Sequence, residues 1–186
     1  MVSLMSLWLP ILLSAVIVFI ASAIIHMLLG YHNSDFAKVP GEDGVIEALG
    51  KIGIPPGDYV FPHACDAKSM KSPDFIAKMT KGPVGVLTVI RSGPPSMTKS
   101  LTLWFIYCVV VGIFAAYIAG RALGPGADYL SAFRFAGCTA FIGHSLALWH
   151  NSIWYGRSSR STLKSTFDGL VYGLLTGGTF GWLWPV

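Results

Sequence analysis

Four long apolar stretches constrain the fold of this chain more than any other feature of its sequence. Each has about the 20 residues that a helix needs to cross the hydrocarbon core of a bilayer. They cover residues 7–29, 101–120, 130–150 and 166–184. In lipid, a spanning segment satisfies its backbone groups only as a helix or within a closed barrel. The sequence therefore predicts an all-α integral membrane protein, a bundle of four transmembrane helices.

The charge content agrees with this fold class. Only 12% of the 186 residues are charged, about half the share of a typical soluble domain. That composition excludes an ordinary soluble enzyme. The net charge of +4 includes no basic run, so we expect no nucleic acid as a partner. The apolar stretches instead predict lipid and other membrane subunits as partners.

A polar segment separates the first stretch from the second. We therefore divide the chain into a first transmembrane helix (1–30), a polar insert (31–100) and helices two to four (101–186). The insert is nearly neutral, with eight Lys or Arg and seven Asp or Glu. Its capping and turn residues predict helices over 42–49 and 72–79 and a strand over 84–90, a small α/β-like fold.

The basic residues near the ends of the stretches predict the orientation. Residues 1–6 contain no Lys or Arg, so we interpret the first stretch as a retained anchor and not as a cleaved signal peptide. Six basic residues flank the two larger loops, whereas two flank the short loop on the side of the termini. They are Lys38, Arg91, Lys99, Arg157, Arg160 and Lys164 against Arg121 and Arg134. Because basic loops stay in the cytoplasm, we expect a cytoplasmic insert and termini outside.

Small residues recur at intervals of four in two of the stretches. The fourth stretch contains Gly169, Gly173, Gly177 and Gly181, and the second contains Gly112, Ala116 and Gly120. Four residues turn a helix by about 400°, so each series lines one slowly wrapping groove. Such grooves let helix backbones approach closely in a membrane. We predict that both are helix-packing surfaces, within this bundle or against another subunit.

Three histidines are candidate cofactor ligands. His144 shares a helical face with small residues, so we expect it to point into the bundle. His26 lies on a stripe with Ser22 and at a depth similar to that of His150. Haem b needs two inward histidines at one depth, and a quinone headgroup needs a similar donor. His26 with His144 or His150 is therefore the alternative hypothesis.

Asp168 lies near the start of the fourth stretch. Ser165 and Asp168 have the spacing of a capping box, and the helix dipole favours an anion in the first turn. We therefore interpret Asp168 as a structural residue at a helix start.

No other motif predicts chemistry. His63, Cys65 and Met70 offer soft ligands, but their spacing matches no standard metal site. The sequence contains no nucleophile, phosphate-binding or metalloprotease motif. We expect no catalytic residue and no metal site.

Several segments resemble a family of small bacterial inner-membrane proteins with four predicted spans and no assigned activity. The resemblance lies in the first stretch and in residues 54–59, 71–73, 119–126 and 163–170. It implies a multi-pass protein of the bacterial inner membrane and no activity or cofactor. The orientation predicted from the basic residues then places the termini in the periplasm. With the small-residue grooves, the resemblance favours a non-catalytic subunit or assembly factor of a larger membrane complex, such as a respiratory or photosynthetic one. Binding of haem or quinone is the alternative.

Overall fold

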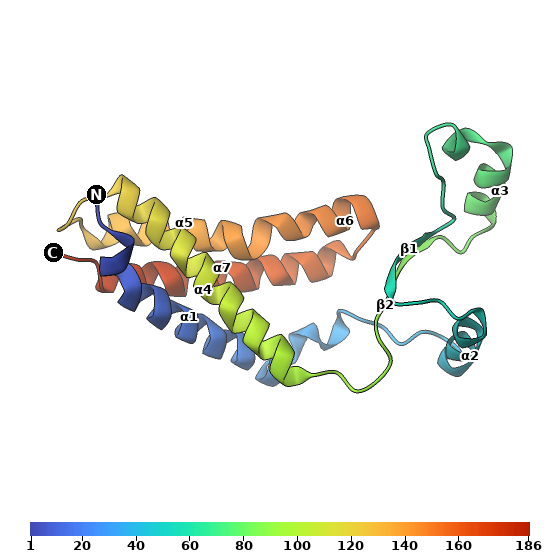
Figure 1. The fold of residues 1–186 in the computed structure, drawn as a ribbon, viewed down its shortest axis with the longest axis horizontal. Coiled ribbons are helices and arrows are strands. Elements are labelled where there is room, and N and C mark those ends of the chain that lie inside the picture. Colours follow the sequence, from blue (N-terminus) through green and yellow to red (C-terminus); the bar gives the residue numbers. More distant parts are fainter. The chain divides into compact units, whose positions relative to one another are not determined.

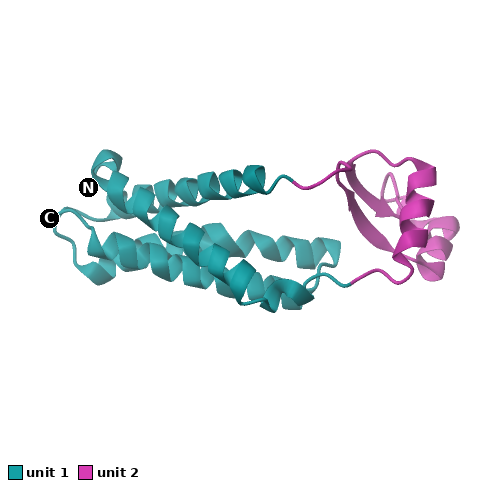
Figure 2. Ribbon diagram, turned by 90° about the horizontal axis from the view of Figure 1, so that it is seen from below, with its two compact units in different colours: residues 1–37, 96–186 teal, residues 38–95 magenta.

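The computed structural model describes residues 1–186 and is mostly helical, with one two-stranded sheet. It divides into two compact units, which Figure 2 distinguishes by colour. The first combines Met1–Ala37 with Ser96–Val186, and the second is Lys38–Pro95. Of the insert expected over 31–100, residues 31–37 and 96–100 belong to the first unit in the structure.

Four long helices make up most of the first unit (Figure 1). They are α1 (Trp8–Ala23), α4 (Met97–Ala122), α5 (Tyr129–Ser145) and α7 (Ser159–Trp182). A short helix, α6 (Trp149–Tyr155), precedes α7. Helix α5 packs along α7 and contacts α4, while α1 packs against α4 and α7. The predicted helical stretches thus form one packed unit.

Both chain termini and the connection between α4 and α5 lie at one end of this unit. The amide of Val2 donates to the carbonyl of Gly120 at 2.8 Å. The amide of Gly126 donates to the carbonyl of Pro185 at 2.8 Å. Successive long helices therefore alternate in direction, and the end of α1 lies at the opposite end of the unit, near the start of α7.

Two helices are long and apolar enough to cross a membrane, Leu4–Leu28 and Met97–Ala122. Helix α5 has 17 residues, and the glycines and hydroxyl residues of α7 make it less apolar. That α5 and α7 also cross the membrane, as the four-span bundle requires, therefore stays a prediction.

The interior of the first unit consists largely of small side chains. Its buried positions include Ala115, Ala119, Ala132, Ala136 and Ala140, together with Ser14, Ser145, Thr176 and Thr179. Small side chains leave little space between neighbouring helices, so the backbones approach closely.

The glycine series of α7 faces α5. A Cβ atom on Gly173 would lie 2.9 Å from the carbonyl oxygen of Gly137, and one on Gly177 would lie 2.7 Å from that of Phe133. Gly169 and Gly181 have equally close neighbours on α5, Ser145 and Tyr129. All four positions therefore lack room for a side chain, and this groove is filled by the chain itself.

The small-residue series of α4 faces the N-terminal segment instead. A Cβ atom on Gly120 would lie 2.8 Å from the carbonyl oxygen of Val2, and one on Gly112 would lie 3.3 Å from that of Ile11. Ala116 is fully buried beside them. The two series therefore pack against different segments and not against each other.

The stretch expected as one helix over 130–150 is interrupted. Helix α5 ends at Ser145, whose φ and ψ are −126° and −52°, and a 3₁₀ turn (Leu146–Leu148) leads into α6. The Tyr107 hydroxyl donates to the carbonyl of Gly143 at 2.5 Å. A continuous helix would offer that carbonyl to an amide four residues later. A side chain from α4 thus competes with the helix at the point where it breaks.

The second unit pairs two short strands and carries two helices. Its elements are α2 (Glu42–Ile52), β1 (Gly57–Phe61), α3 (Pro73–Lys81) and β2 (Gly85–Val89). The strands are antiparallel, with Gly57 opposite Val89. Ser72 is the N-cap of α3, because its hydroxyl accepts from the amide of Phe75 at 3.2 Å. Strand β1 was not predicted, since its residues lie between prolines in a turn-rich sequence.

Candidate functional site

A buried polar network connects α7 with the segment that follows the first helix. Lys164 and Asp168 are four residues apart on α7, so both side chains project from one face of the helix. That face contacts a 3₁₀ turn (Tyr31–Ser34) and Asp35 through hydrogen bonds. Gly30, at φ +62°, makes the left-handed turn that directs this segment back toward α7.

His32 lies between two carboxylates. Its Nδ1 is 2.7 Å from Oδ2 of Asp35, and its Nε2 is 2.8 Å from Oδ2 of Asp168. The side chains of His32, Asp35 and Asp168 are 12%, 8% and 4% exposed. The bridge is therefore largely withdrawn from water, and the Tyr31 hydroxyl donates to the second oxygen of Asp168.

Lys164 completes the charge balance of the network. Its Nζ donates to the carbonyl of Tyr31 at 2.6 Å, to Oγ of Ser34 at 2.8 Å and to Oδ1 of Asp35 at 2.8 Å. Hydrogen bonds from His32 and Lys164 lower the pKa of Asp35 to about 2. The Lys164 ammonium thus faces the Asp35 carboxylate, and this buried charge is paired.

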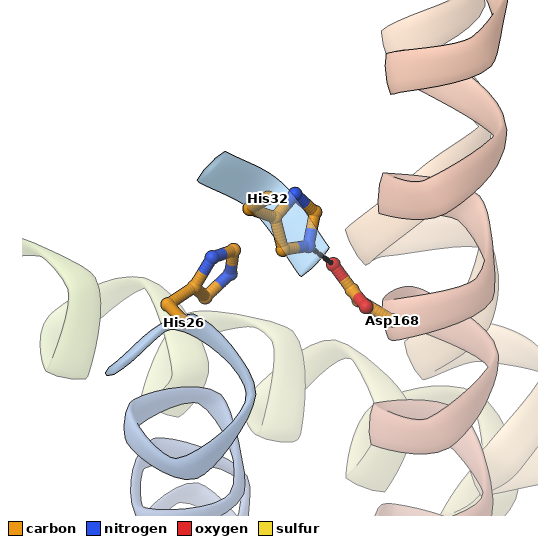
Figure 3. Close-up of side chains that lie close together, drawn as sticks. All are labelled: His26, His32 and Asp168. Atoms are coloured by element: carbon orange, nitrogen blue, oxygen red, sulfur yellow. Dashed lines mark hydrogen bonds and ion pairs between the residues drawn. The ribbon is translucent and has the colours of Figure 1, made fainter. Parts of the chain in front are cut away.

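His26 joins this cluster from the end of the first helix. It lies in a π-helical turn (Ile24–Leu28), which is closed by the bond from the amide of Leu29 to the carbonyl of Ile24 at 3.2 Å. Its ring centroid is 4.4 Å from that of His32. Figure 3 shows the two imidazoles and the Asp168 carboxylate gathered between the two segments. Three potential metal ligands therefore come together here, with ligand atoms within 4.8 Å of one another.

A second polar group is enclosed by aromatic rings. His144 is 8% exposed, and the rings of Trp104, Tyr107 and Tyr172 lie 5.7, 5.5 and 5.3 Å from it, measured between centroids. We call these three rings the aromatic box. Nδ1 of His144 and the hydroxyl of Tyr172 have no hydrogen-bond partner. Buried polar atoms of this kind are usually met by ordered water or a ligand.

The structure separates the three histidines that the sequence singled out. His144 is buried, in agreement with the predicted inward face, and contacts the aromatic box. His26 is exposed and contacts His32, which the sequence analysis did not consider. His150 is exposed on α6. The contacts of His26 and His144 are with different residues, and neither is paired with His150.

The interpretation of Asp168 as a cap residue is wrong. Helix α7 begins at Ser159, before the expected start at 166, so Asp168 lies beyond its second turn and is 3% exposed. The Ser165 hydroxyl donates to the carbonyl of Ser161 at 3.1 Å and caps no helix start. Asp168 is instead the acceptor for both Tyr31 and His32.

Four residues of the network were missed by the sequence analysis: Tyr31, His32, Asp35 and Lys164. The only local signal for them is the spacing of His32 and Asp35, three residues apart next to an apolar stretch. Polar residues at such a boundary are common, so that spacing alone does not distinguish a site from a solvated helix end.

No protein-family model, curated protein or solved structure matches this chain.

Proposed function

We propose that this chain is a four-span protein of a bacterial inner membrane and serves as a non-catalytic accessory or assembly subunit of a larger membrane complex. The observation that carries the subunit role is the surface of the second unit. None of its residues, Lys38–Pro95, is fully buried. A unit this small makes little core of its own and needs a further surface to cover its apolar residues.

The membrane location is supported by the distribution of apolar side chains. Each long helix of the first unit exposes large hydrophobic residues, for example Ile20, Phe114, Ile142 and Phe167 at 54%, 59%, 55% and 60% exposure. Small and hydroxyl-bearing residues occupy the interior instead. In water such a surface would aggregate, whereas in a bilayer the lipid chains cover it.

Helix α2 presents an uncovered apolar face in the second unit. Val45, Ile46 and Ile52 lie on one side of the helix and are 38%, 64% and 69% exposed. Glu47 and Lys51 form an ion pair at 2.6 Å on the other side. An amphipathic helix buries its apolar face against a partner. We propose that this face contacts another protein subunit.

Two double variants of α2 test this role. Ile46→Ser with Ile52→Ser places two serines on the apolar face, whereas Glu47→Ser with Lys51→Ser places two on the polar face and also leaves the net charge unchanged. Each variant and the wild type are purified from native membrane in mild detergent, and co-purifying proteins are quantified. We expect one defined protein to co-purify in a fixed ratio with the wild type and the polar-face variant, and to be lost from the apolar-face variant.

A photoreactive residue at position 46 shows whether a partner protein, lipid or another part of the chain covers this face. Crosslinks to the same co-purifying protein support the proposal. Crosslinks only to lipid, or only within the chain, overturn it, as does equal co-purification with both double variants.

The haem alternative requires two of His26, His144 and His150 to face one site, whereas His26 contacts His32 and His144 contacts the aromatic box.

A further inference from the structure

We propose that His26, His32 and Asp168 bind one divalent first-row transition-metal ion, such as Zn²⁺. The three side chains offer two imidazole nitrogens and one carboxylate oxygen within 4.8 Å of one another. Two histidines and a carboxylate are a recurrent ligand set for zinc and for non-haem iron. This inference is independent of the proposed subunit role.

The separations between the ligand atoms are close to those that a metal site needs. Two ligands of one tetrahedral zinc ion lie about 3.3 Å apart, given metal–ligand distances of about 2.0–2.1 Å. Nε2 of His32 and Oδ2 of Asp168 are 2.8 Å apart, so a small widening admits the ion between them. His26 is exposed and makes no side-chain hydrogen bond, so its ring is free to rotate toward the ion.

The surroundings of the ligands match those of known metal sites. A metal-bound histidine typically donates its other ring nitrogen to a carboxylate, which fixes the orientation of the ring. Nδ1 of His32 is 2.7 Å from Asp35, and Lys164 holds Asp35 in turn at 2.8 Å. The Tyr31 hydroxyl likewise holds the second oxygen of Asp168. Two of the three ligands are therefore oriented before an ion arrives.

Binding exchanges a proton for the ion. Nε2 of His32 and Oδ2 of Asp168 are at hydrogen-bond distance, 2.8 Å, so one proton is shared between them. When the ion binds both atoms, that proton leaves to solvent, because metal ligands must be deprotonated. Three protein ligands leave one tetrahedral position for water.

Cobalt titration of the full chain tests the site. The protein is purified in detergent with a tag that lacks histidine, freed of metal with a chelator and titrated with Co²⁺, whose visible absorption reports ligation. We expect absorption that saturates at one equivalent and disappears on addition of Zn²⁺. We also expect Zn²⁺ to raise the Tm of the wild type, since an ion that binds the native state stabilises it.

His26→Asn and His150→Asn provide a matched pair of variants. Both replace an exposed histidine, and neither removes a hydrogen bond of the network, so both should fold. We expect His150→Asn to bind like the wild type and His26→Asn to weaken Co²⁺ binding at least about 100-fold. Asp35→Asn, which alters the support of His32 and the ion pair with Lys164 but removes no ligand, should weaken it about 10- to 100-fold.

Three results would overturn the proposal: no saturable binding near one equivalent, equal binding by His26→Asn and His150→Asn, or an equal Zn²⁺-induced rise in the Tm of wild type and His26→Asn. Either equality would show that the ion binds elsewhere on the chain.

Discussion

Nε2 of His32 and the carboxylate of Asp168 lie 2.8 Å apart, although 136 residues separate them in the sequence. This contact holds the 3₁₀ turn Tyr31–Ser34, which follows the first helix, against α7. It also connects two other groups, since His32 bonds to Asp35 and Asp168 accepts from Tyr31. The network therefore fixes the path of the chain between the first helix and the second unit.

Asp168→Asn should destabilise the first unit strongly. It removes the carboxylate that both Tyr31 and His32 contact, and a buried hydrogen-bonding group left without its partner costs about 1–3 kcal/mol. The matched control is Asp74→Asn, since Asp74 also has a partner at 2.8 Å, Lys78, but both side chains are mostly exposed. That control should cost less than about 1 kcal/mol. The measurement is thermal unfolding in detergent, and equal Tm values for both variants would contradict the structural role of the network.

Gly177→Leu and Gly173→Leu should disrupt the packing of α7 against α5. No side chain fits, because a Cβ atom on either residue would lie within 2.9 Å of a carbonyl oxygen of α5. Overpacking of this kind costs about 3 kcal/mol. Leu174→Phe, at a position 50% exposed, should change the stability by less than about 0.5 kcal/mol. Wild-type Tm values for both glycine variants would show that the two helices separate easily.

The Trp104 indole and the Ser22 hydroxyl should be energetically coupled. The indole Nε1 donates to Oγ of Ser22 at 2.8 Å, between α4 and α1. Hydrogen bonds between membrane helices contribute about 0.6 kcal/mol on average. We therefore expect Trp104→Phe and Ser22→Ala to be non-additive by about that amount in a double-mutant cycle of unfolding free energies. Strict additivity would mean that the bond contributes nothing to stability.

Asp128 should make the start of α5 pH-dependent. Hydrogen bonds from the hydroxyl and amide of Ser131 lower the pKa of Asp128 below its usual value of 3.8. A lowered pKa stabilises the native state fully above the unfolded value, and this contribution is lost as the pH falls through the native value. Asn is an equally good N-cap residue without charge. The Tm difference between wild type and Asp128→Asn should therefore shrink below about pH 4, and a constant difference would contradict this.

Cys65 reports the side of the membrane on which the second unit lies. It is exposed within that unit, and Cys108 is buried. Cys138 is also exposed, but it lies on α5, which the four-span prediction places in lipid, where the reagent does not reach. If the insert is cytoplasmic, a membrane-impermeant maleimide should label the chain in inverted vesicles and not in spheroplasts. Cys65→Ser should abolish the labelling. Labelling in spheroplasts would reverse the orientation that the basic residues predict.

Local patterns in the sequence predicted which helices form more successfully than the residues at which these helices begin and end. The apolar stretches located the long helices, and Ser72 with Pro73 located the start of α3. The helix interruption after Ser145 was not predicted, because it involves a hydroxyl from α4, Tyr107. Strand β1 was also missed, since its pairing with β2 across 30 residues is what makes it a strand.

The sequence alone determined that long apolar helices form and that glycines recur along one side of α7, because both properties depend on residues a few positions apart. It did not determine which helix fills that groove, nor that Asp168 meets His32. The reading of Asp168 as a cap followed a correct local spacing in a helix that in fact begins at Ser159. The tertiary structure decided these points, because a buried carboxylate takes its role from the groups that packing brings to it, and those groups come from distant parts of the chain.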